Sequence, residues 1–108
     1  MRKIEQLMND AIRNRARYWG KDNTRVEWNS IVEGSNGTKH IAKSDVFLHG
    51  NHIATVYQDT GEIKVNLYTL RRWPTMTTRS RLRALGADLE SIKGVLHLNG
   101  KSIYSEAE

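Results

Sequence analysis

The residues best suited to bind a ligand lie between positions 71 and 83, where arginines are mixed with hydroxyl side chains. This stretch holds five of the seventeen lysines and arginines of the chain. A helix that begins among threonines offers free backbone amides to an anion, and guanidinium groups bind phosphates and carboxylates through paired hydrogen bonds. We therefore expect a site for an anionic partner, made by the helix at 75–85 and the loop before it, with contacts from Arg71, Arg72, Trp73, Thr77, Thr78, Arg79, Arg81 and Arg83.

Helical spacing limits how these arginines act together. Arg79 and Arg83 are four residues apart and share a face, whereas Arg81 points away from them. One flat partner therefore cannot reach all of them through the helix alone, but a groove or a wrapping partner can. We expect every guanidinium group to reach solvent, so that the five arginines are central to binding and dispensable for folding, while the core is built by Leu70, Trp73, Leu82 and Leu85.

Two classes of partner fit this composition. A formal net charge of +5 and a pI near 9.7 favour acidic partners, with nucleic acid first among them. Trp73 lies beside the arginines and is able to stack on a base, so we expect backbone contacts with little base preference. The alternative is an acidic surface of a host protein, contacted by residue types that are common at interface hot spots, such as Trp28, Tyr68 and Trp73. Composition separates neither the two partners nor the oligomeric states.

Signatures of catalysis or of a metal site are missing from the sequence. There is no cysteine, and among the four histidines only His49 and His52 lie close together, on either side of an expected turn. A zinc site needs three or four ligands. The chain also lacks a phosphate-binding glycine loop, a GxSxG motif and a convincing acidic pair. We expect a non-enzymatic binding protein with no catalytic residue, no metal and no cofactor.

The hydrophobic pattern predicts the elements that would position the site. Apolar residues at helical spacing predict an amphipathic helix over residues 3–19, which is stopped by Gly20 and packs on a sheet. Alternation predicts a strand over 26–32 that ends at a loop near 34–37, and then a three-stranded meander over 46–67 with a turn near Gly50-Asn51. Further along the chain, we expect the short basic helix at 75–85, ended by Gly86, and a C-terminal hairpin that turns at Asn99-Gly100.

Together these elements predict a single compact basic α+β domain over residues 1–108, with a mostly antiparallel sheet and helices on one of its faces. No apolar run approaches membrane-spanning length, and the first residues lead into an amphipathic pattern instead of a signal peptide. We therefore expect a cytoplasmic protein that does not contact membranes.

The later half of the chain resembles a known group of proteins. The pattern consists of Leu48-His49-Gly50-Asn51 followed by Ile53-Ala54, then Trp73-x-Thr75-x-Thr77-Thr78-Arg79-x-Arg81-Leu82, and Leu98-Asn99-Gly100-Lys101. It is similar to small accessory proteins of tailed bacteriophages, over about residues 46–104. The resemblance implies a phage origin and a location in the cytoplasm of an infected bacterium. Because such proteins have no assigned activity, it implies no site residue. It suits equally an inhibitor of a host or defence complex.

Overall fold

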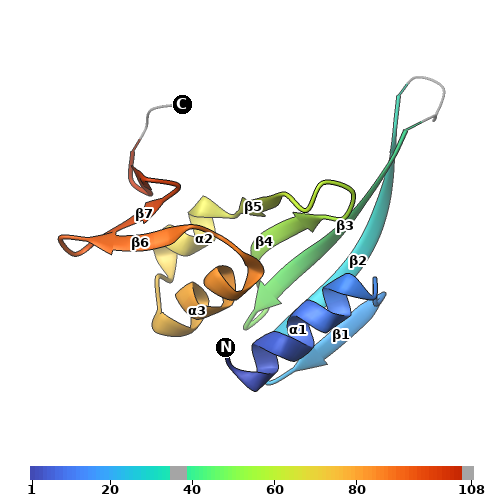
Figure 1. Cartoon of the computed structure of the whole chain (residues 1–108), viewed down its shortest axis with the longest axis horizontal. Coiled ribbons are helices and arrows are strands. Elements are labelled where there is room, and N and C mark those ends of the chain that lie inside the picture. Colours follow the sequence, from blue (N-terminus) through green and yellow to red (C-terminus); the bar gives the residue numbers. More distant parts are fainter. Residues whose placement is uncertain (35–38, 106–108) are drawn as a thin grey trace.

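The structure is a computed structural model that describes residues 1–34 and 39–105 (Figure 1). It combines helices with antiparallel sheets, which confirms the expected α+β class. In chain order the elements are α1 (Lys3–Arg13), β1 (Tyr18–Lys21), β2 (Thr24–Glu33), β3 (Lys39–Leu48), β4 (Asn51–Tyr57), β5 (Ile63–Val65), α2 (Leu67–Arg72), α3 (Met76–Leu85), β6 (Leu89–Ile92), β7 (Val95–Leu98) and β8 (Lys101–Ser102).

The strands form two antiparallel sheets in which each strand pairs with its neighbours in the chain. The larger sheet has the order β1-β2-β3-β4-β5, and the smaller one has the order β6-β7-β8. In the larger sheet Val26 pairs with Val46, and Val46 in turn pairs with Ala54, so these three residues share a face. All three are buried. This face is therefore the core side of the sheet.

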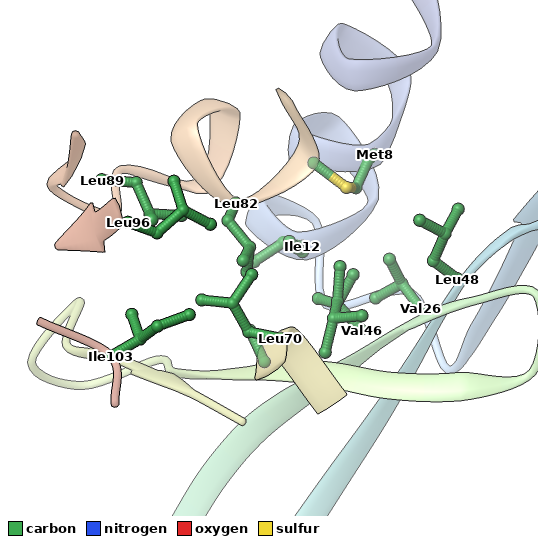
Figure 2. Close-up of a cluster of buried hydrophobic side chains, with 12 residues drawn as sticks. Met8, Ile12, Val26, Val46, Leu48, Leu70, Leu82, Leu89, Leu96 and Ile103 are labelled. Carbon is green, nitrogen blue, oxygen red and sulfur yellow. The ribbon is translucent and has the colours of Figure 1, made fainter. Parts of the chain in front are cut away.

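Helices α1 and α3 pack on the core side of the larger sheet, and they also contact each other (Figure 1). Met8 and Ile12 of α1 and Leu82 of α3 meet the valines of the sheet, and Leu70 of α2 joins the same cluster (Figure 2). The smaller sheet adds Leu89, Leu96 and Ile103 to this cluster. Elements from both ends of the chain thus bury apolar surface together, and each Å² of apolar surface removed from water stabilises the fold by about 25 cal/mol.

The first helix is shorter than the sequence predicts. It ends at Arg13, and Arg15 has a φ of 54°, outside the helical region. Tyr18 and Trp19 then lie in β1, where they pair with Glu27 and Val26 of β2. The expected helix over 3–19 is therefore wrong in its last third, and Gly20 lies within a strand instead of stopping a helix. Pairing with β2 gives these residues backbone partners that helical periodicity does not reveal.

Several further boundaries differ from the expectation. The strand predicted over 26–32 extends to Thr24–Glu33, and β3 begins at Lys39, well before the expected start of the meander. Leu67 begins α2, because the side chain of Asn66 accepts a hydrogen bond from the backbone of Thr69 and so caps a new helix. The closing hairpin has a third strand, β6, and its last strand stops at Ser102. The predicted loop near 34–37 lies mostly outside the described residues.

The turn at Asn99-Gly100 is confirmed. Both central residues have positive φ, 55° and 81°, as a type I′ turn requires. A Cβ added at Gly100 would meet no atom within 4 Å, so a substitution there changes only the backbone preference.

We expect Gly100→Val to lower the free energy of unfolding by about 1–3 kcal/mol, because a β-branched residue resists positive φ. Thermal unfolding followed by circular dichroism measures this effect. Gly100→Asn is the matched control, since asparagine tolerates this conformation and should remain close to the parent protein. Equal melting of the valine variant and the parent would show that the turn is not under this constraint.

Among the described residues, none of the helices has the length and apolar character that spanning a bilayer requires.

Candidate functional site

Two short helices carry the predicted binding residues. Asn66 caps α2, and Thr75 caps α3 by accepting a hydrogen bond from the backbone of Thr78 at 3.1 Å. Gly86 ends α3 in the left-handed conformation, with a φ of 110°. The predicted basic helix is therefore confirmed. The stretch before it is not the expected loop, however, because Arg71 and Arg72 form the last turn of α2.

An exposed group of cationic and aromatic side chains lies at the end of α2. The guanidinium carbon of Arg72 lies 4.9 Å from the ring centre of Trp73 and 5.6 Å from that of Tyr68. Its Nη1 also donates a hydrogen bond to the Tyr68 hydroxyl at 3.0 Å. Tyr68 and Trp73 are nevertheless 66% and 41% exposed. We call Tyr68, Arg72 and Trp73 the stacking group, because both rings stay accessible while they hold the guanidinium in place.

Arg79 and Arg83 line an open cavity of about 450 Å³ together with Arg2 from the start of α1. Their Nε atoms are used internally: Arg79 Nε donates to the carbonyl of Thr75 at 3.4 Å, and Arg83 Nε donates to that of Leu89 at 3.0 Å. None of the three forms an ion pair with a carboxylate of residues 1–34 or 39–105. We call Arg2, Arg79 and Arg83 the arginine cavity. Of the basic residues at the start of the chain, which the sequence allows to extend one cationic surface with the arginine-rich helix, Arg2 lines this cavity.

Arg81 is buried, which contradicts the expectation that all five guanidinium groups reach solvent. It is 5% exposed. Its Nη1 contacts Glu5 Oε2 at 2.8 Å, and its Nε donates to the hydroxyl of Thr24 at 3.0 Å. Arg81 therefore joins α3 to α1 and β2, and it is not available at the surface for the binding role predicted from the sequence.

Glu5 is the buried partner of this ion pair, with an exposure of 2%. Burial raises the pKa of its carboxyl, but hydrogen bonds from Ser80, Arg81 and the backbone of Arg2, with the charge of Arg81, outweigh it. The net result is a pKa below the ordinary value. Glu5 is also the acidic residue that lines the arginine cavity, and its charge is already matched by Arg81. The field in that cavity is consequently set by Arg2, Arg79 and Arg83.

The remaining predicted residues divide between two places. Arg71 donates through Nε to the carbonyl of Ile103, and so ties α2 to the end of the smaller sheet. Trp73, Thr77 and Thr78 line a second cavity of about 330 Å³, between the α2–α3 region and the β3–β4 turn. The eight predicted residues thus do not form one surface. They form the stacking group, one side of the arginine cavity, part of the second cavity, and two internal ties.

Sequence reasoning missed a chain of polar contacts on the opposite face of the larger sheet. Asp45 pairs across the strands with Thr55, and the Thr55 hydroxyl donates to Asp45 Oδ1 at 2.7 Å. His52 Nε2 lies 3.0 Å from that hydroxyl, and His52 Nδ1 lies 3.1 Å from Asn66 Nδ2. These contacts depend on strand register and on the bulge at Val46/Phe47, so no motif in the sequence marks them.

The direction of these hydrogen bonds determines what His52 is able to do. The Oδ1 of Asn66 accepts from the backbone of Thr69, so its Nδ2 donates to His52 Nδ1. The proton of the neutral ring then lies on Nε2 and is donated to Thr55. His52 is therefore not placed to accept the Thr55 proton, although the spacing resembles that of a base and a nucleophile. Within residues 1–34 and 39–105, no three His, Asp or Glu side chains gather as a potential metal site.

A family model, described as Kyanoviridae Gp96 protein, matches residues 1–108. The chain belongs to this phage protein family. Searches of curated proteins and of solved structures give no match.

Membership in the Kyanoviridae Gp96 family confirms the phage origin that the resemblance over residues 46–104 implied. The match also includes the N-terminal helix, which lay outside that resemblance. Because the family description names no activity, it assigns no role to Arg79, Arg83 or any other residue. The function must be argued from the site itself.

Proposed function

We propose that this phage protein is a non-enzymatic accessory protein that binds nucleic acid through backbone contacts, in the cytoplasm of an infected bacterium. The observation that carries the proposal is the arginine cavity, in which Arg2, Arg79 and Arg83 converge without a free carboxylate among the described lining residues. The Nη groups of Arg79 and Arg83 are left to donate to phosphate oxygens after their Nε atoms have bonded backbone carbonyls.

Two further features support nucleic acid. The stacking group holds a guanidinium beside two exposed rings, a combination suited to a phosphate and to the face of a base. The net charge of +5 adds a long-range attraction that does not depend on sequence. Contacts of this kind position a polyanion without reading base edges, so we expect little sequence preference.

The second candidate is a phage inhibitor that binds an acidic surface of a host or bacterial-defence protein. The observation in its favour is that two exposed methionines line the arginine cavity. Met76 is 72% exposed and Met1 is 73% exposed. Arginine and methionine are both enriched at protein interfaces. The salt dependence of binding to nucleic acid separates the two candidates.

The proposed function is tested by the salt dependence of binding. Each phosphate contact releases condensed counterions, so Arg79→Gln should reduce the slope of log affinity against log salt by about 0.9 on duplex DNA and about 0.7 on a single strand. Fluorescence anisotropy with labelled DNA of unrelated sequences measures both slopes. The loss should be similar for every sequence.

Arg17→Gln is the control, because Arg17 is exposed and lies beyond the opposite end of α1 from the arginine cavity. Its slope should match that of the parent. Two results together would favour the inhibitor instead. The protein would show no salt-sensitive binding to either form of DNA, and it would form a complex with a host protein that survives nuclease treatment and is lost with Arg79→Gln.

A further inference from the structure

The second cavity, between α2, the start of α3 and the β3–β4 turn, differs chemically from the arginine cavity. It has a volume of about 330 Å³, and Trp73 forms part of its lining. The other lining residues include Thr69, Thr77, His49 and Asn51. None of the described lining residues is an aspartate, glutamate, lysine or arginine. The cavity therefore offers an aromatic ring, polar groups and the apolar side chains of Leu48 and Ile53, but no carboxylate, ammonium or guanidinium group to pair with an ionic ligand.

Thr69 adds a hydrogen-bonding group to the wall of this cavity. Thr69 is 6% exposed, and what remains accessible of it faces the cavity that it lines. Thr78, which lines the same cavity, shares a hydrogen bond with Thr75 at 2.9 Å. A threonine hydroxyl is able both to donate and to accept a hydrogen bond. The hydroxyl of Thr69 is therefore able to hydrogen-bond with a polar group of a ligand in the cavity.

The chemistry of the lining selects the class of ligand. A flat ring is able to stack on Trp73, and both donors and acceptors on its edge find partners in the threonine hydroxyls and the amide of Asn51. The volume lies in the lower part of the range for small-ligand sites. A negatively charged group would have no cation inside the cavity, whereas Arg72 lies just outside it, 4.9 Å from the centre of the Trp73 ring.

We propose that this cavity binds one unpaired nucleobase, with Trp73 as the stacking wall, Thr69 as a hydrogen-bonding partner and Arg72 beside the adjoining phosphate. The proposal rests on the proposed nucleic-acid function and adds the substrate class to it. Only an unstacked base is able to enter, so the protein selects single-stranded nucleic acid over duplex.

The test compares two short single-stranded oligomers of equal length and charge, a thymidylate oligomer and its abasic counterpart. The oligomer with bases should bind roughly 5- to 150-fold more tightly, the factor that one stacked base contributes. Trp73→Ala should remove this preference and change the affinity for the abasic oligomer much less, because Tyr68 still holds Arg72 through its hydroxyl. Tyr104→Ala is the control, because it deletes another exposed aromatic ring, one that does not line the cavity.

Thr69→Val provides a second and milder variant, because it keeps the shape of the side chain and removes only the hydroxyl. It should weaken binding of the thymidylate oligomer by about 2- to 10-fold without affecting the abasic one. Equal binding of the two oligomers by the parent protein would overturn the nucleobase site while leaving backbone binding intact. Failure of both oligomers to bind at low salt would instead overturn the proposed function, and the nucleobase site with it.

Discussion

Replacing Arg81 with methionine should lower the free energy of unfolding by about 3–5 kcal/mol, although surface charges on a helix are usually dispensable. The substitution removes one member of a buried ion pair and leaves Glu5, which is 2% exposed, without its countercharge. It also removes the hydrogen bond to the hydroxyl of Thr24. Urea unfolding at neutral pH, followed by tryptophan fluorescence, measures the loss.

Arg83→Met is the matched control, because it removes an exposed arginine two residues further along α3 and should change the stability little. Adding Glu5→Met to Arg81→Met should recover part of the loss, since the isolated buried charge is then gone. If Arg81→Met and Arg83→Met unfold at the same urea concentration, the ion pair does not hold α3 in place.

The dependence of stability on pH tests the same ion pair independently. Because the pKa of folded Glu5 is lowered, its contribution is present above the pKa of the unfolded chain and is lost as pH falls through the folded value. The parent protein should therefore lose stability as the pH falls below 4.5, the ordinary pKa of a glutamate carboxyl. The Glu5→Gln variant lacks this contribution at every pH. The difference in stability between the two proteins should narrow in acid.

Reversing the charges of the arginine cavity should have the largest effect on binding. Arg79→Glu combined with Arg83→Glu places two carboxylates where we propose that phosphates bind, and should abolish measurable binding of nucleic acid at moderate salt. The fold should be retained, because Arg83 is exposed and Arg79 is only partly covered. Anisotropy titrations measure binding, and circular dichroism confirms the fold.

Arg15→Glu combined with Arg17→Glu is the control for this pair. It makes the same change in net charge at exposed positions beyond the far end of α1, which is about 16 Å long at 1.5 Å per residue. If both double variants lose binding equally, only the overall charge attracts the partner. If neither loses it, the arginine cavity is not the site.

The sequence predicted well those elements whose signals are local. Thr75 and Gly86 mark the two ends of α3, because a hydroxyl cap and a left-handed glycine act within one helical turn. Asn99-Gly100 turns for the same reason. The boundary between α1 and β1 was missed, because the apolar residues at 18 and 19 fit a helical face and a strand equally well. Only pairing with β2 decides between them.

The candidate site could be predicted in part. The sequence identified Trp73, Arg79 and Arg83 as residues near one another in the chain. The structure exposes Trp73 and Arg83 and leaves Arg79 partly accessible, although α3 faces two cavities instead of one. Arg2 could not be assigned to this site, because it lies far away in sequence and reaches the cavity only when α1 packs on α3. Thr69 gave no signal at all, because its place in the second cavity depends on how α2 packs beside α3 and the β3–β4 turn.

By itself, the sequence determined the α+β class, the basic helix, the closing turn and the phage family. These follow from periodicity, caps, turn residues and motif identity, all of which act over short spans of the chain. The tertiary structure alone decided which arginines face solvent. Helical spacing separated Arg81 from Arg79 and Arg83, but it did not say which face meets the core. Glu5 and Thr24 determine this, because they present a buried carboxylate and a hydroxyl to α3, and both contact the guanidinium of Arg81.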